Sequence, residues 1–150
     1  MNREVLVRKA TFQDIADIHQ LVRELAVYEK AEHEFIATLE DYKAHFTENA
    51  FNALVAITQE KEVIGMALYY PTYSTWKGKM MYLEDFVVKQ SYRRRGIGSM
   101  LFEAFLEDAK QKGCQLVKWQ VLDWNEPALQ FYNKQSAMIE KEWWNGKIFF

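Results

Sequence analysis

Cysteine is almost absent from the sequence, with Cys114 alone among 150 residues. A single cysteine excludes an internal disulfide framework and a metal site built from cysteines. We interpret Cys114 as a small buried hydrophobic residue rather than as a nucleophile. His33 and His45 lack a partner at metal-binding spacing, so the sequence predicts no metal site.

Long apolar runs and a strong net charge are also missing. No segment approaches the roughly 20 apolar residues of a membrane span, and the opening MNREVLVRKATF has no apolar signal core. The formal net charge of -2 argues against a generally basic nucleic-acid-binding protein. We therefore expect a cytoplasmic protein with no membrane or nucleic-acid partner.

The residues that are present have the composition of an ordinary globular protein. Hydrophobic residues make up 49% of the chain and charged residues 27%. A chain of 150 residues is long enough to bury a core, and it shows no internal repeat or linker. These features predict one domain over residues 1–150.

Hydrophobic periodicity predicts a mixed α/β fold, with a central sheet of six to seven strands flanked by about four helices. Thr11–Asp14 and Thr38–Asp41 fit capping boxes before the first two helices. Asn145–Gly146 fits the turn of a C-terminal hairpin, and strand–helix–strand alternation in the second half predicts a parallel pair. The expected strands are 4–10, 53–58, 63–73, 79–88, 115–122 and a hairpin over 137–150, and the expected helices end near 29, 47, 112 and 133.

The segment SYRRRGIGSML, residues 91–101, joins a predicted strand to a predicted helix. Gly96 and Gly98 remove side chains, and a helix N-terminus offers N–H groups and the positive end of the helix dipole. Three preceding arginines add positive charge. This combination favours a phosphate-bearing ligand over a plain basic surface turn. The P-loop pattern is absent, and Leu101 stands where the dinucleotide fingerprint needs a small residue.

The residues from Arg93 to Gly98 fit the pattern Arg/Gln-x-x-Gly-x-Gly/Ala, which resembles the acetyl-CoA loop of the GNAT N-acetyltransferases. The segments YLEDFVV, YRRRGIGS, WNEPALQFY and LAVYEK are similar to the diamine branch of that family, which acetylates spermidine, spermine or thialysine. The similarity covers nearly the whole chain in the same order. It implies a single GNAT domain that uses acetyl-CoA as cosubstrate.

The resemblance also implies which residues contact the cofactor. In the family, the strand before the loop lends backbone groups to the pantetheine arm, and the loop holds the pyrophosphate. The implied cofactor-binding residues are Phe86, Val87, Val88, Arg93, Arg94, Arg95, Gly96, Ile97, Gly98, Ser99, Asn125, Pro127 and Tyr132.

Acetyl transfer to an amine needs a neutral amine, although alkyl amines titrate near 10. Glu84 and Asp85 are the carboxylates available, and strand alternation sends them to opposite faces unless a bulge intervenes. The family has such a bulge, and its glutamate here acts as a base or binds the amine. For Asp85, a solvated carboxylate and a substrate-binding residue are both open. The N–H of Val87 is a candidate donor to the thioester oxygen.

Tyr132 is the candidate general acid that protonates the leaving thiolate. It follows Asn125 by two helical turns, so both side chains can face one ligand. A phenol titrates near 10, close to an alkyl thiol. The alternative is a core tyrosine, and the family match favours the acid, with direct attack in a ternary complex. The family usually has a glycine soon after this tyrosine, where this chain has Ser136.

The acceptor site is expected near the acidic segment YEKAEHEF. Its carboxylates Glu29, Glu32 and Glu34, together with Glu84 and Asp85, are candidates for an anionic pocket that binds a multiply charged amine. By resemblance, Tyr28 and Glu29 contact the substrate. Solvated positions are expected for Glu32 and Glu34.

Three functions are compatible with these residues. The leading hypothesis is an enzyme that acetylates a primary amine of a small di- or polyamine or of a thialysine-like amino acid. A peptide or protein amine acetyltransferase is the second, and a non-catalytic CoA-binding module is the third. Glu84 and Tyr132 argue against the third. Relatives in this branch imply a homodimer, and the apolar tail EWWNGKIFF suggests an interface.

Overall fold

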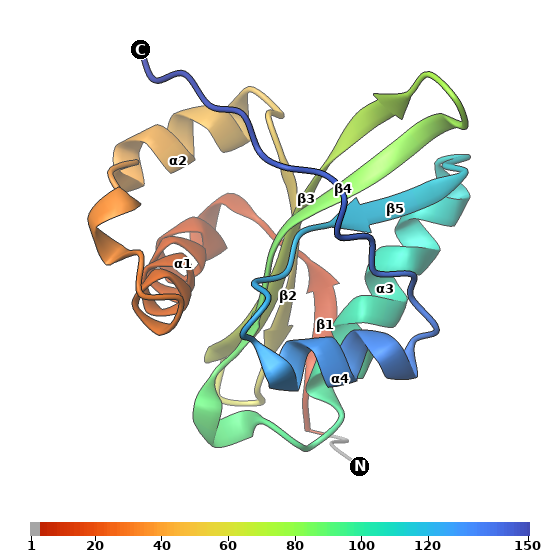
Figure 1. Cartoon of the computed structure of the whole chain (residues 1–150). Helices are drawn as coiled ribbons and strands as arrows, with labels where there is room; N and C mark the ends of the chain where they lie inside the picture. Colours follow the sequence, from red (N-terminus) through yellow and green to blue (C-terminus); the bar gives the residue numbers. More distant parts are fainter. Residues whose placement is uncertain (1–3) are drawn as a thin grey trace. The chain divides into compact units, whose positions relative to one another are not determined.

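The computed structural model describes residues 4–150, and the chain divides after Gln120 into two compact units. The first unit is built on a five-stranded sheet in the order β1-β2-β3-β4-β5 (Figure 1). Neighbouring strands are antiparallel except β4 and β5, which form the predicted parallel pair. The strands are β1 Leu6–Lys9, β2 Asn52–Ile57, β3 Val63–Ser74, β4 Gly78–Val88 and β5 Leu116–Trp119.

Three helices cover the two faces of this sheet. Helices α1 and α2 lie on one face and α3 lies on the other, as Figure 1 shows. Each face packs a row of buried aliphatic and aromatic side chains against its helices, so the sheet is the centre of the core. The helices are α1 Ile15–Tyr28, α2 Leu39–Thr47 and α3 Ile97–Gln111, with short 3-10 turns at η1 Phe12–Asp14, η2 Glu32–Glu34 and η3 Gln90–Tyr92.

The two predicted capping boxes are present at the starts of η1 and α2. The backbone N–H of Thr11 donates to the Asp14 carboxylate at 2.7 Å. The N–H of Thr38 donates to Asp41 at 2.9 Å, and the N–H of Asp41 donates back to the Thr38 hydroxyl at 3.1 Å. Local side-chain bonds therefore set where these helical segments begin.

A buried carboxylate holds α3 against the sheet. Asp108 on α3 accepts hydrogen bonds from the Tyr69 hydroxyl of β3 at 2.7 Å and from Lys9 of β1 at 3.0 Å. Lys112, one turn further along α3, donates to the same carboxylate at 3.0 Å. Three donors satisfy this group, so its burial is compatible with a stable core.

The second unit begins at Val121 and contains α4, Glu126–Lys134. The side-chain oxygen of Asn125 accepts from the N–H of Ala128, as predicted for an N-cap, and Pro127 lies in the first turn. Ser136, just after the helix, has a φ of 61°. Glycine adopts this left-handed backbone conformation with less strain than serine.

The predicted C-terminal hairpin is wrong: residues 137–150 form no strand, so the described part of the chain has five strands rather than six or seven. Asn145–Gly146 remains a valid turn signal, but two strands on their own are only marginally stable in water. The large side chains of this tail, among them Trp144 and Phe149, are exposed. Within residues 4–150, no helix is long and apolar enough to cross a membrane.

Candidate active site

A β-bulge in β4 brings two adjacent carboxylates to one face of the sheet. Leu83 pairs with Tyr69 of β3 and Asp85 pairs with Leu68, so Glu84 between them has no partner position. The alternation reverses across this extra residue. Tyr82 stacks on Tyr70 on the face that carries α1 and α2, whereas the Phe86 ring contacts α3 on the other face. The predicted bulge is therefore present.

Glu84 is exposed and is held by a tyrosine of the neighbouring strand. The Tyr70 hydroxyl donates to a Glu84 carboxylate oxygen at 2.6 Å. The Tyr70 ring lies 5.6 Å from the Tyr82 ring in a stacked arrangement, which limits its movement. Burial, followed by the bond to Glu84, raises the pKa of Tyr70, so its hydroxyl remains a donor at neutral pH.

Asp85 lies in a more enclosed position among other acidic groups. Burial raises its pKa to about 7, and the charges of Glu84 and Glu29 act in the same direction. Glu29, at the C-terminal end of α1, is partly buried, and burial raises its pKa as well. Tyr42 of α2 completes the surroundings: burial and the charges of Asp85 and Glu84 raise its pKa. The predicted anionic cluster of Glu29, Glu84 and Asp85 thus forms within the first unit.

The other acidic residues of the segment after α1 are more exposed than Glu29 and Asp85. Glu32 and Glu34 are exposed on η2, as expected for solvated charges.

Tyr28 is 39% exposed at the end of α1. Its ring lies under the Arg93 guanidinium, 5.5 Å from the ring centroid. A cation–π contact therefore joins the end of α1 to the arginine-rich loop.

The loop after β4 is fixed to the sheet by side chains as well as by backbone. The N–H of Lys89 donates to the carbonyl of Ile64 at 2.8 Å. Arg93 Nε donates to the carbonyl of Val88 at 3.0 Å, which folds the loop back onto the end of β4. Arg93 is thus engaged by the protein, although the sequence assigns it to the cofactor. Arg94 and Arg95 are exposed, and Arg95 lies 5.3 Å from the Tyr92 ring centroid.

Gly96 gives α3 an N-terminus without a side-chain cap. Its φ is 79°, a left-handed conformation that glycine adopts without strain. A Cβ placed there would meet no described atom within 4 Å, so the space above this backbone is open. Ile97 is buried beneath the first turn, while Gly98 and Ser99 are partly exposed. N–H groups of the first helical turn, the positive dipole end and the exposed arginines suit a phosphate group.

The strand before this loop parts from its parallel neighbour. The β4–β5 ladder covers only Met80–Leu83 and Leu116–Trp119. From Asp85 to Val88, β4 forms a ladder with β3 alone. An extended ligand can add to a strand edge of this kind through main-chain hydrogen bonds. The stretch that holds Phe86, Val87 and Val88 could therefore bind an extended ligand, and the helix N-terminus beyond it suits a phosphate group.

The second unit carries three other predicted site residues, Asn125, Pro127 and Tyr132. Tyr132 is 6% exposed and lies on α4 beside Phe131, with ring centroids 5.5 Å apart. Asn125 uses its side-chain oxygen for the N-cap bond to Ala128.

Comparison with known proteins decides the family. Residues 15–137 match the family described as Acetyltransferase (GNAT) family. The chain belongs to this acetyltransferase family. It is 40% identical to thialysine N-epsilon-acetyltransferase of Bos taurus, over 94% of this chain and 89% of that protein. L-ornithine N5-acetyltransferase NATA1 of Arabidopsis thaliana is 27% identical over 91% of this chain and 81% of its own length.

A solved structure supports the fold of this GNAT acetyltransferase. An aminoglycoside acetyltransferase from an uncultured soil metagenomic sample, in complex with trehalose, superimposes with a TM-score of 0.82. The match covers 99% of this chain and 98% of that one at 21% identity, so it bears on the fold alone. The mixed α/β GNAT fold expected from the sequence is confirmed.

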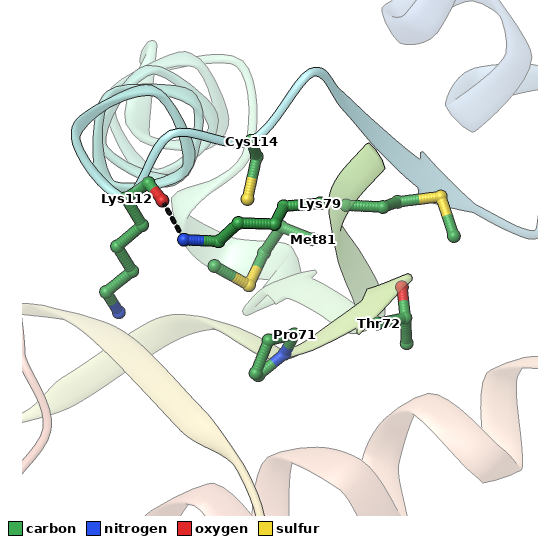
Figure 2. A pocket seen from close by; sticks show the side chains of 7 residues that line it. Pro71, Thr72, Lys79, Met81, Lys112 and Cys114 are labelled. Carbon is green, nitrogen blue, oxygen red and sulfur yellow. Dashed lines mark hydrogen bonds between the residues drawn. The ribbon is translucent and has the colours of Figure 1, made fainter. Parts of the chain in front are cut away.

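The acetyltransferase also has a small pocket away from the predicted residues. It has a volume of about 280 Å³, and Figure 2 shows its lining side chains. Lys79 crosses it and donates to the backbone carbonyl of Lys112 at 2.7 Å, at the C-terminal end of α3. Cys114 lines the pocket and is only partly buried, so the expectation of a buried cysteine is wrong. None of the predicted site residues lines this pocket.

Three tyrosines beside the bulge of β4 were missed by sequence reasoning. Tyr42, Tyr70 and Tyr82 surround Glu84 and Asp85, yet tyrosines in strands and amphipathic helices are usually interpreted as core residues. The available signal was the bulge: once Glu84 is an extra residue, Tyr82 shares a face with Asp85. Across residues 4–150, no group of three or more His, Cys, Asp or Glu is placed to hold a metal ion.

Proposed function

We propose that this acetyltransferase transfers the acetyl group of acetyl-CoA to a primary amine of a small di- or polyamine or of a thialysine-like amino acid. The observation that carries the proposal is the cluster of Glu29, Glu84 and Asp85 on one face of the first unit. The charges of Glu29 and Glu84 both act on the Asp85 carboxyl group, and three carboxyl groups in one region favour an acceptor with more than one positive charge. The names of the thialysine and ornithine acetyltransferases that the chain resembles agree with such an acceptor.

The open backbone around Gly96 supports the proposed binding of acetyl-CoA. We assign the pyrophosphate to the N–H groups from Gly96 to Ser99, with charge from Arg94 and Arg95. Main-chain groups of Phe86 and Val88 would hold the pantetheine arm. Asn125 and Pro127 are assigned to the same cosubstrate from the family resemblance.

The chemistry follows from the needs of acyl transfer. A carboxylate of the acceptor face takes a proton from the ammonium group, and the neutral amine attacks the thioester directly in a ternary complex. The N–H of Val87 is proposed to donate to the carbonyl oxygen, where negative charge develops. Tyr132 is proposed to donate its phenolic proton to the leaving thiolate, because a phenol and an alkyl thiol have similar ordinary pKa values.

A panel of amines tests the acceptor class. Acetyl-CoA is supplied with thialysine, ornithine, putrescine, spermidine, a monoamine of equal length and a lysine-containing peptide, and the release of free thiol is followed. We expect the dicationic small amines to have the highest kcat/KM. Preference for the peptide would replace the small-amine acceptor with a protein amine, and no release with any amine would contradict catalysis.

Tyr132→Phe tests the acid. The variant loses one oxygen, so we expect turnover to fall by about 10²–10⁴-fold while the affinity for acetyl-CoA changes little. A core tyrosine would give the reverse pattern, with a lower Tm and nearly normal turnover. Tm, affinity and turnover are measured on the same preparation.

We further propose that residues 1–150 act as one catalytic domain and that the protein is a homodimer. The exposed aromatic side chains of Trp143, Trp144 and Phe149 support a partner surface at the C-terminal tail. Sedimentation velocity at micromolar concentration should show the dimer, and a monomer there would contradict it. A cytoplasmic location stays a prediction.

A further inference from the structure

The two adjacent carboxylates of the bulge have different surroundings, and this difference has a chemical consequence that rests on the proposed function. Glu84 is exposed, and one of its oxygens already accepts the 2.6 Å hydrogen bond from Tyr70. Tyr70 is in turn stacked on Tyr82. Glu84 is therefore oriented by the protein and open to a solvated cation.

Asp85 pairs with Leu68 of β3, on the face of the sheet that carries α1 and α2, and acidic and phenolic groups of the neighbouring elements interact with its charge. Glu84 lies beside it on β4, Glu29 approaches from the end of α1, and Tyr42 from α2. Tyr70 on β3 also interacts with its charge. None of these four groups is a cation. Withdrawal from water and repulsion by like charges both favour the protonated form of a carboxyl group.

We propose that Asp85, rather than Glu84, accepts the proton of the acceptor ammonium, and that Glu84, held by Tyr70, binds the ammonium cation. The acceptor R–NH₃⁺ transfers one proton to the Asp85 carboxylate, which leaves neutral R–NH₂ and a carboxylic acid. The amine nitrogen then forms the C–N bond as the C–S bond breaks. The leaving thiolate takes the phenolic proton of Tyr132, and the proton that the new amide nitrogen loses restores the phenol. Asp85 later releases its proton to solvent.

The proton affinity of Asp85 supports this division of roles. A general base is most effective when its pKa lies near the operating pH, and the pKa of Asp85 is raised to about 7. The charges of its acidic neighbours increase the proton affinity of the Asp85 carboxylate. The arrival of the ammonium cation supplies the positive charge that the cluster lacks.

The first test follows carboxyl titration by ¹³C NMR in the ligand-free protein, with aspartate labelled in one sample and glutamate in another. We expect one aspartate signal with a midpoint near neutral pH in wild type and in Glu84→Gln. It should disappear in Asp85→Asn, and in Asp85→Glu a near-neutral signal should move to the glutamate-labelled sample. An aspartate signal with a near-neutral midpoint that persists in both Asp85 variants, or a near-neutral midpoint that belongs to Glu84, overturns the proposal.

The second test measures kcat and KM against pH with the best amine of the panel. Asp85→Asn should lower kcat by about 10²–10⁴-fold and remove the loss of activity on the acid side of neutral. Asp85→Glu should recover part of the rate. Glu84→Gln should raise KM and keep the acid limb. The reverse assignment of these effects overturns the proposal.

The two tests separate failure of this proposal from failure of the proposed function. NMR titration needs no turnover, so it locates the proton whether or not the protein acetylates an amine. A wild type that releases no thiol with any amine overturns the proposed function and the base role together. Normal turnover in Asp85→Asn overturns the base role alone.

Discussion

The hydroxyl oxygen of Tyr70 lies 2.6 Å from a carboxylate oxygen of Glu84, at the bulge that interrupts the regular pairing of β3 and β4. This bond joins β3 to the extra residue of β4. The bond lies at an exposed position, where water competes for both groups, so it orients Glu84 more than it stabilises the fold. Tyr70 thus positions a carboxylate without itself being a reacting group.

Tyr70→Phe removes this bond and keeps the stacked ring. We expect KM for a dicationic amine to rise roughly tenfold, because Glu84 loses its fixed orientation. Tm should change little. Tyr73→Phe is a matched control on the same strand, since Tyr73 is 68% exposed. Equal kinetics in both variants would remove Tyr70 from the acceptor site.

Gly96→Glu tests the phosphate site at the start of α3. A carboxylate there would repel the pyrophosphate, so binding of acetyl-CoA should be abolished in calorimetric titration while the protein stays folded. Gly113→Glu provides the control, because Gly113 has the same φ of 79° just after the other end of α3. Both variants carry similar backbone strain, and only Gly96→Glu should lose binding. Unchanged affinity in a folded Gly96→Glu variant would place the phosphate elsewhere.

Asp85→Asn should make the protein more stable at alkaline pH. The pKa of Asp85 is raised from 3.8 to about 7, so the folded state binds more protons than the unfolded chain between these values. Stability from this group is therefore present below pH 4 and is lost as pH rises through 7. We expect Tm of Asp85→Asn to exceed that of wild type by roughly 2–8 °C at pH 8, or about 1–2 kcal/mol, and by much less at pH 5.

The control for this pH dependence is Asp17→Asn, a substitution at an exposed aspartate of α1. Its Tm difference from wild type should be nearly the same at pH 5 and pH 8. A pH-independent difference for Asp85→Asn would show that its carboxyl group titrates as an ordinary aspartate.

Ser136→Gly should stabilise the turn after α4. Ser136 has a φ of 61°, which costs a residue with a Cβ about 1 kcal/mol relative to glycine. We expect Tm to rise by roughly 2–4 °C in thermal unfolding. Ser136→Ala keeps the Cβ and should give no such gain. A gain in the alanine variant would trace the effect to the hydroxyl group instead.

Local sequence signals predicted the parts of the fold that local bonds determine. Thr38 and Asp41 mark the start of α2 through their reciprocal bonds, and Asn125 marks the start of α4. The Asn145–Gly146 signal did not produce the predicted hairpin. A turn sets the geometry of a hairpin but does not supply partners for its strands.

The candidate site was predictable only where a motif carries it. The glycines after β4 predicted an open helix N-terminus, and the resemblance to the GNAT family gave Glu84 and Tyr132 as candidate site residues. Arg93 shows the limit of a motif, because its Nε is bonded to Val88 and its guanidinium lies over Tyr28. Tyr42 and Tyr70 depend on how α2 and β3 face β4, which no local pattern encodes.

The bulge makes Glu84 an addition to β4 rather than one of its regular positions. Leu83 and Asp85 already face opposite sides of the sheet, as consecutive residues of an unbroken strand would. Removal of residue 84 would join these two positions, and every other side chain of β4 would keep its face. A strand can thus gain a functional group by insertion of one residue without loss of a core contact. A substitution at a packed position of either face would instead remove a core side chain.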